Sequence, residues 1–575
     1  MGVILDVVYN HTAQTHLFED LEPNYYHFMD ADGTPRESFG GGPLGTTHHM
    51  ARRVMVDSIK YWVDEFKVDG FRFDMMGDHD AEAIQEAFDS AAVLNPNMLM
   101  IGEGWITFEG DETDQDVQAA DQLWMIDTDS VGVFSDEVRN ELKSGFGSEG
   151  EPRFLTGGAR NIQLIFQNIM GNPSNFTADA PGDVVQYIAA HDNLTLHDVI
   201  AQSIKKDPKD HSGEIHQRIR LGNLMILTSQ GTPFIHSGQE YGRTKQYRHE
   251  DYITPVADGS EPYKSTYMTD ADGKPFEYPY FIHDSYDSSD AVNMFNWEQA
   301  TNSELYPIQG ITQSYTTGLI QLRRYTDAFR QGTAEDVAAN VSLITSPEIG
   351  EEDLVIGYQA IDSNGDIYIV FINADNNLRN LTLTDEFAYI ANGEIIVDGL
   401  VAGTEAIANP TGVMLADGSL TLDPLTATII RLKASETETV TEDIAFETIE
   451  SDSDAVATGE RQVLQAGVNG ERTITYLVRY EKGVEVSREI VSSEVTREAI
   501  NQLVEVGVAV AEAETEPNPM PQVPVEASDL TLAKAQVLPN TGENSNATLL
   551  GAAAIVALSG GALVGMGRKR ETDNN

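Results

Sequence analysis

The sequence contains no cysteine among its 575 residues, and basic residues are scarce. Without cysteine the protein forms no disulfide, has no thiol nucleophile and holds no cysteine-ligated metal. Only 36 lysines and arginines stand against 92 aspartates and glutamates, which gives a formal net charge of −56. This charge opposes adsorption to anionic lipid and binding to nucleic acid, which depends on basic side chains that neutralise phosphates. It favours solubility and neutral partners such as sugars.

The first residues lack the marks of a secretory signal peptide. Residues 1–6 have no basic start and no cleavage site, and their pattern is that of a buried strand. A complete domain rarely opens in its core. We therefore expect the chain to be the C-terminal piece of a longer protein, or to start at an internal methionine.

Strands and helices alternate over residues 1–333. The expected strands are 3–8, 68–74, 99–103, 123–127 with a continuation to residue 134 left open, 184–191 and 232–236. The expected helices are 50–66, 79–93, 135–143, 196–205 and 214–228. This alternation predicts an α/β fold with a parallel sheet, and specifically a (β/α)8 TIM barrel. Six strands are visible, so we expect a barrel lacking its first two strands, which would precede Met1.

The pattern changes to short alternating strands after residue 333. We expect an antiparallel β-sandwich domain over 334–433, with strands at 353–360, 366–373, 381–384, 394–397, 413–415 and 427–432. The acidic stretch 434–442 has the composition of a linker. A small extended β module over 437–509 follows, with strands at 461–466, 472–480 and 484–491. Residues 510–537 are rich in Pro, Glu and Ala and predict a disordered linker.

Residues 538–575 contain three parts in order. Leu538-Pro539-Asn540-Thr541-Gly542 comes first, an uncharged apolar run at 547–566 follows, and Arg568-Lys569-Arg570 comes last. The run is long enough to cross a bilayer as a helix. The basic triplet then predicts a cytoplasmic C-terminus. Taken alone, the run could be a permanent anchor.

Charged side chains stand at the ends of several expected strands. Asp74 and Glu103 end two successive strands, and Asp192 follows a later one. One strand-end carboxylate is more often a loop-stabilising acceptor than a catalyst. Several on one barrel are harder to explain structurally, because branched apolar side chains fill a barrel interior and active sites gather at its C-terminal face. A pair of carboxylates is what glycoside hydrolysis needs.

Each group can be given a physical role in that reaction. Asp74 must be ionised to attack the anomeric carbon, and Arg72, two residues earlier on the same face, would keep it so. Glu103 needs a raised pKa to protonate the leaving oxygen. We expect the two carboxyls to lie about 5–5.5 Å apart, as in retaining enzymes. Further sugar contacts are expected from His11, Trp105, His191 and Asp192.

Four segments, 6–11, 70–74, 102–105 and 190–193, resemble the four ordered sequence regions of the alpha-amylase superfamily, glycoside hydrolase family thirteen. Residues 231–240 resemble its last barrel strand. The resemblance implies a retaining mechanism in which Asp74 is the nucleophile, Glu103 the acid/base and Asp192 the transition-state stabiliser. It further implies substrate binding by His11, Arg72, Trp105, His191 and Asn193.

Within the superfamily, Met75-Met76-Gly77, Trp105 and residues 193–198 look like type I pullulanase. That resemblance implies cleavage of α-1,6 branch bonds in pullulan, glycogen and starch-derived dextrins. The Tyr-Asn-Trp-Gly-Tyr motif of that subfamily is not in the sequence. Two alternatives stay open: an amylase-type hydrolase of α-1,4 or mixed specificity, and a surface glycan-binding adhesin with impaired catalysis.

The C-terminal third resembles two extracellular elements. Residues 437–509 are similar to the glycine-five (G-five) module, for which a plain β spacer and a glycan-binding role both remain open. Residues 538–575 resemble an LPXTG sortase signal of Gram-positive bacteria. This implies cleavage after Thr541 by sortase and covalent attachment of a secreted protein to peptidoglycan. Membrane contact would then be confined to the transient helix 547–566.

The sequence requires no cofactor and predicts no metal ligands for the reaction. Acidic loops at 30–33, 111–116 and 284–290 could bind calcium, but none has the spacing of an EF-hand loop. We interpret them as solvated loops and keep calcium as the alternative.

Overall fold

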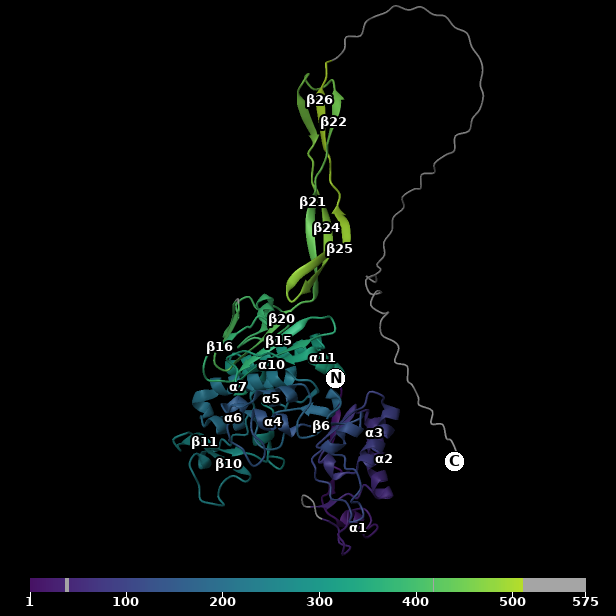
Figure 1. The fold of residues 1–575 in the computed structure, drawn as a ribbon, viewed down its shortest axis with the longest axis vertical. Coiled ribbons are helices and arrows are strands. Elements are labelled where there is room, and N and C mark those ends of the chain that lie inside the picture. Colours follow the sequence, from purple (N-terminus) through teal and green to yellow (C-terminus); the bar gives the residue numbers. More distant parts are fainter. Residues whose placement is uncertain (37–40, 417, 510–575) are drawn as a thin grey trace, which may run out of the picture. The chain divides into compact units, whose positions relative to one another are not determined.

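A six-stranded parallel sheet organises the first part of the chain, which is coloured purple to teal in Figure 1. The computed structural model describes residues 1–36, 41–416 and 418–509. The strands, in their order across the sheet, are β1 (Ile4–Val7), β4 (Gly70–Phe73), β5 (Leu99–Gly102), β6 (Gly132–Phe134), β8 (Val184–Gln186) and β9 (Thr232–Pro233). Every neighbouring pair is parallel. The C-terminal ends of all six strands therefore share one edge of the sheet.

Helices follow the strands as the alternation predicts. They are α2 (His49–Phe66), α3 (Ala81–Leu94), α4 (Asp136–Leu142), α5 (Ile162–Ile169), α6 (Leu196–Ile204), α7 (Pro208–Thr228) and α10 (Pro307–Tyr325). In α2, Met55, Ile59 and Val63 recur at helical spacing and are buried. In α3, the Asp80 carboxylate caps the N-terminus by accepting the Ala83 N–H at 3.0 Å.

One expected strand is wrong. Residues 123–127 lie in the 3₁₀ helix η2 (Gln122–Asp127), and the strand here is β6. Asp121 starts the helix by accepting the Leu123 N–H at 2.9 Å. Trp124 and Met125 are buried while Leu123 and Ile126 are exposed, which is helical and not alternating burial. The apolar residues of this segment did not indicate a helical turn that starts at a capping aspartate.

Several elements were not expected from the sequence. They include a hairpin of β10 (Ser265–Thr269) and β11 (Pro275–Ile282) after α7, and the helices α5 and α10. Shorter elements are β2 (His11–Thr12), β3 (Gly42–Pro43), β7 (Arg160–Asn161), α1 (His16–Glu19), α8 (Asp290–Asn293), α9 (Trp297–Thr301) and α11 (Ala334–Asn340). The remaining 3₁₀ turns are η1 (Met76–Asp78), η3 (Phe154–Thr156), η4 (Pro181–Asp183), η5 (Gln239–Tyr241), η6 (Glu250–Tyr252) and η7 (Ala388–Asn392).

Two antiparallel sheets follow α11. The larger has the order β12 (Val341–Leu343), β14 (Val355–Ile361), β15 (Ile367–Asn373), β20 (Thr426–Leu432) and β17 (Glu394–Val397). The smaller has the order β16 (Arg379–Thr382), β19 (Ser419–Leu422) and β18 (Val413–Ala416). Val355, Phe371, Leu420 and Ile430 from both sheets pack in one core. All six expected strands are present, and β12, β19 and the short β13 (Glu352–Asp353) add to them.

The acidic stretch 434–442 is not a linker. It forms most of β21 (Ser435–Ile444), which pairs antiparallel with β24 (Gly470–Glu481), and β24 in turn pairs with β25 (Val484–Arg497). Basic side chains offset the negative charge of the glutamates in this strand. One of them is Arg488, whose guanidinium lies 2.5 Å from the Glu438 carboxylate. Threonine and valine at the other positions favour the extended backbone.

The last described strands are β22 (Thr448–Ser453), β23 (Arg461–Gln465) and β26 (Gln502–Gly507). The chain divides into two compact units, one of residues 1–450 and 463–504 and one that includes residues 451–462 and 505–509. In the second unit, Gly459 and Gly507 are joined by a backbone hydrogen bond of 2.9 Å.

No helix within residues 1–36, 41–416 and 418–509 combines the length and apolar character needed to cross a bilayer. The expected transmembrane helix 547–566, the linker 510–537 and Thr541 lie outside the described residues.

Candidate active site

Strand register brings the first acidic groups together. Asp6 in β1 lies opposite Arg72 in β4, and Asp74 and Glu103 directly follow β4 and β5. The strands approach closely at Gly70, where an added Cβ would lie 2.1 Å from the Leu99 carbonyl oxygen. Glycine at position 70 therefore permits this close approach of the two strands.

Arg72 is the centre of this cluster. Its Nη1 donates to Asp6 Oδ1 at 2.8 Å and to Asp74 Oδ1 at 2.9 Å, and its Nη2 lies 3.0 Å from Glu103 Oε2. The Arg72 side chain is only 10% exposed. Burial alone would lower its pKa, but the charges of Glu103 and Asp6 outweigh that and raise the pKa above the usual value. One fixed cation thus orients three carboxylates.

Glu103 is tuned by opposing effects. Burial raises its pKa most, while Arg72 and the Met75 N–H, which donates to Oε2 at 3.1 Å, lower it. The charges of Asp192 and Asp74 add to the increase, and the net pKa is raised. Glu103 therefore keeps its proton to a higher pH than a free glutamic acid does, as a general acid requires.

Met75 is held in an unusual backbone conformation beside these groups. Its φ of +41° lies in the left-handed region, which costs a non-glycine residue roughly 1–2 kcal/mol. This geometry turns the Met75 N–H toward Glu103. Strained residues of this kind gather at functional sites, and no pattern in the sequence announces this one.

Asp192 and His191 stand on the loop that follows β8. His191 Nε2 lies 3.4 Å from Asp192 Oδ2, and both side chains are about half exposed. The charge of Asp192 contributes to the raised pKa of Glu103, so the two carboxyls share one electrostatic environment. Asn193 has a φ of +59°, and its Nδ2 donates to Glu149 Oε1 at 2.8 Å. The structure therefore couples this loop to the cluster through charge.

The two remaining predicted contacts lie in different surroundings. His11 is half-buried in β2, opposite Pro43 of β3. Trp105 is half-buried beside Tyr187, and the Arg139 guanidinium lies 5.8 Å from its ring centroid. Arg139 also donates to the Tyr187 hydroxyl at 2.6 Å. Arg139 is therefore a neighbour of Trp105 that the sequence did not indicate.

A cavity of about 450 Å³ opens beside the Asp192 loop, within the size range of small-ligand sites. His191 and Asp192 line it together with side chains that sequence reasoning missed: His236, Arg243, Lys245, Asp284 and Tyr286. The sequence had pointed to two segments that carry some of them, residues 231–240 with His236 and the acidic loop 284–290, but not to these side chains as a group. In that loop, Lys264 Nζ lies 2.9 Å from Asp284 and 3.8 Å from the centroid of the Tyr286 ring.

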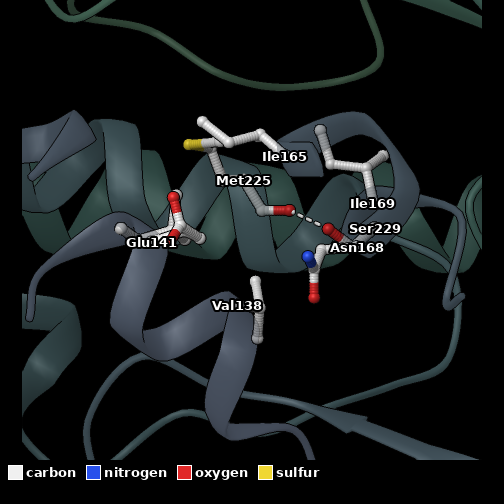
Figure 2. Close-up of a pocket in the computed structure, with 8 residues that line it drawn as sticks. Val138, Glu141, Ile165, Asn168, Ile169, Met225 and Ser229 are labelled. Atoms are coloured by element: carbon white, nitrogen blue, oxygen red, sulfur yellow. Dashed lines mark hydrogen bonds between the residues drawn. The ribbon is translucent and has the colours of Figure 1, made fainter. Parts of the chain in front are cut away.

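A second hollow lies among α4, α5 and α7 and is a packing void. Figure 2 shows it between Val138, Glu141, Ile165, Asn168, Ile169, Met225 and Ser229. Its volume of about 10 Å³ is close to the space of a single water. Ser229 Oγ is already engaged by the Met225 carbonyl at 2.7 Å. The residues that line this hollow do not include those of the strand-end cluster.

Protein donors already contact the acidic loops that were considered for calcium. Asp111 accepts the Met29 N–H at 2.6 Å and lies 2.7 Å from His48 Nε2. Asp32 accepts both the N–H and the hydroxyl of Thr34. In the described ranges, no group of three or more His, Asp or Glu side chains is arranged to hold a metal ion.

Family models match most of the chain. The model for the alpha amylase catalytic domain matches residues 41–304, and the one described as SpuA C-terminal matches 340–433. Residues 41–304 are therefore similar to the alpha amylase catalytic domain. The G5 domain model matches 435–509 and the LPXTG cell wall anchor motif matches 533–574. The resemblances to the alpha-amylase superfamily, the glycine-five module and the LPXTG signal are therefore confirmed. The anchor motif identifies a secreted, cell-wall-attached protein.

Several of the similar proteins are pullulanases. Pullulanase A of Streptococcus pneumoniae is 60% identical over 442 residues, covering 76% of this chain and 34% of the relative. The catalytic module of the glycogen-degrading pneumococcal virulence factor SpuA superposes with a TM-score of 0.74 at 60% identity, covering 75% of this chain and 61% of that one. The group B Streptococcus pullulanase SAP gives 0.73 at 61% identity, covering 75% and 56%. The chain thus spans about a third of the curated relative's length.

Proposed function

We propose that this chain hydrolyses α-1,6-glucosidic branch bonds in pullulan, glycogen and starch-derived dextrins at the bacterial cell wall. The observation that carries the proposal is the placement of Asp74 and Glu103 at neighbouring strand ends on one guanidinium. The named activities of the similar proteins, pullulanases and a glycogen-degrading module, support the choice of substrate.

The mechanism follows from the charges of the cluster. Asp74, held by the Arg72 guanidinium, attacks the anomeric carbon while Glu103 protonates the departing oxygen. The glutamate anion that remains is stabilised by Arg72 and the Met75 N–H. It then removes a proton from a water that attacks the anomeric carbon, which breaks the bond to Asp74 and releases its carboxylate. Asp192 stabilises the positive charge that develops on the sugar.

The remaining predicted residues complete the proposal. His11, Trp105, His191 and Asn193 contact the substrate sugar, and the Asp74 and Glu103 carboxyls lie about 5–5.5 Å apart, which gives retention of configuration. A crystal structure with a bound oligosaccharide would measure both, and a carboxyl separation near 9 Å would contradict retention.

We further propose the domain plan that the sequence suggested. Residues 1–333 form the catalytic part with the strand order of a (β/α)8 barrel, supported by six consecutive parallel strands. The β domain spans 334–433, the glycine-five module 437–509, the linker 510–537 and the sorting signal 538–575. Sortase cleaves after Thr541 and joins the protein to peptidoglycan, which the anchor-motif match supports.

The test is release of reducing sugar from pullulan by the purified chain without residues 547–575. We expect maltotriose as the product, and Asp74→Ala should abolish it. Products other than maltotriose would instead indicate α-1,4 or mixed cleavage. Retention on glycogen without new reducing ends would indicate the adhesin. Either result would overturn the proposal.

A further inference from the structure

Lys245 is a buried lysine that brackets the Asp192 loop. Its Nζ donates to the carbonyl oxygens of His191 and Asn193, each at 2.8 Å. These are the residues on either side of Asp192. Lys245 is 1% exposed, although an ammonium group is costly to bury.

The base of Lys245 is fixed by other elements. Its own N–H donates to Asp198 Oδ2 at 2.7 Å, and the neighbouring Thr244 hydroxyl donates to Asp198 Oδ1 at 2.5 Å. Asp198 lies in the first turn of α6, directly after the loop. The Lys245 carbonyl accepts the N–H of Ile282, the last residue of β11, at 3.1 Å. The loop, α6 and the 244–245 segment therefore lock one another.

We propose that Lys245 is a positioning residue, which places Asp192 by holding the backbone on both sides of it. This inference rests on the proposed function, in which Asp192 acts on the transition state. The Asp192 carboxylate is half exposed toward the cavity, so its position depends on the backbone that carries it. Two fixed carbonyls, one before and one after, leave the loop little freedom to shift.

The kinetic test removes the two donors but keeps the length of the side chain. Lys245→Met should lower kcat for pullulan about 100-fold, the scale of a misplacement near 1 Å, with KM changed less than about 3-fold. The matched control is Lys209→Met, an exposed lysine paired with Glu277, which should keep full activity.

A double-mutant cycle separates positioning from general damage. In an Asp192→Asn background, Lys245→Met should cost less than about 3-fold more, because Lys245 acts through Asp192. Independent, multiplying losses would overturn the proposal. An activated aryl maltotrioside keeps the slow variants measurable.

Hydrogen exchange tests whether Lys245 holds the backbone around Asp192, and this measurement does not need enzyme activity. The amides of residues 191–194 should exchange at least about 10-fold faster in Lys245→Met than in the parent or Lys209→Met. Unchanged exchange would overturn the inference. If the parent protein lacks activity, the proposed function fails. The exchange rates still test whether Lys245 holds the backbone around Asp192. If Lys245→Met does not fold, Lys245→Gln takes its place in both tests, and failure of both to fold would show a purely structural lysine.

Discussion

The two halves of the candidate site are held in different ways. In the strand-borne half, Asp74 and Glu103 directly contact the Arg72 side chain, which a central strand fixes. In the loop-borne half, Lys245 holds the backbone around Asp192, whose carboxylate stays half exposed. A cation bound to carboxylates fixes their position and also contributes to their electrostatic environment, whereas a cation bound to backbone carbonyls fixes only the position of the loop.

This difference matches the separate needs of the two halves. A nucleophile and an acid must hold different protonation states at one pH, so their environments have to push their pKa values apart. A group that stabilises charge on the sugar needs chiefly the correct position. The predictions below test this division from the largest expected effect to the smallest.

The strand-borne carboxylates should carry the largest effects. Asp74→Asn and Glu103→Gln should each lower kcat for pullulan by roughly 10³-fold or more, at the upper part of the range for acid–base catalysis. A glycosyl fluoride has a leaving group that needs no proton. With this substrate the rate of the first chemical step should largely recover in Glu103→Gln but not in Asp74→Asn. Equal losses on both substrates would contradict the assigned roles.

Arg72 should matter for stability as well as for rate. Arg72→Met leaves two largely buried carboxylates, Asp74 and Glu103, without their cation, and should lower the free energy of unfolding by about 3 kcal/mol. Arg53→Met is the control, because its pair with Asp57 is exposed and should contribute less than about 0.5 kcal/mol. Urea unfolding measures both. A loss below about 1 kcal/mol for Arg72→Met would remove its central role.

The two halves should be coupled through the pKa of Glu103. Because that pKa is raised, the rate should fall as the pH rises through it and the acid loses its proton. The charge of Asp192 contributes to the increase, so Asp192→Asn should shift the alkaline limb of kcat/KM toward lower pH. A pH profile on the activated substrate measures this. A shift toward higher pH would show that Asp192 does not act on Glu103 by charge.

The sequence predicted the strand-borne half better than the loop-borne half. Gly70 and Arg72 lie on β4 and Asp74 directly follows it, so the two-residue alternation of an extended chain is enough to place them on one face. Lys245 reaches His191 across 54 residues, and no local pattern connects them. Local patterns also failed at η2, where capping by Asp121 starts a helical turn within an apolar segment. They failed at β21 as well, because pairing with β24 makes an acidic segment a strand.

The smallest effect should come from Glu149, the other contact of the loop. Its carboxylate accepts from the Asn193 side chain at 2.8 Å, whereas Lys245 binds the backbone itself. Glu149→Gln keeps an acceptor oxygen and should change kcat/KM less than about 3-fold, within the net value of one hydrogen bond. Initial rates on pullulan, compared with those of Lys245→Met, measure the difference. A loss as large as that of Lys245→Met would mean that side-chain contacts fix the loop, and the contrast between the two halves would then disappear.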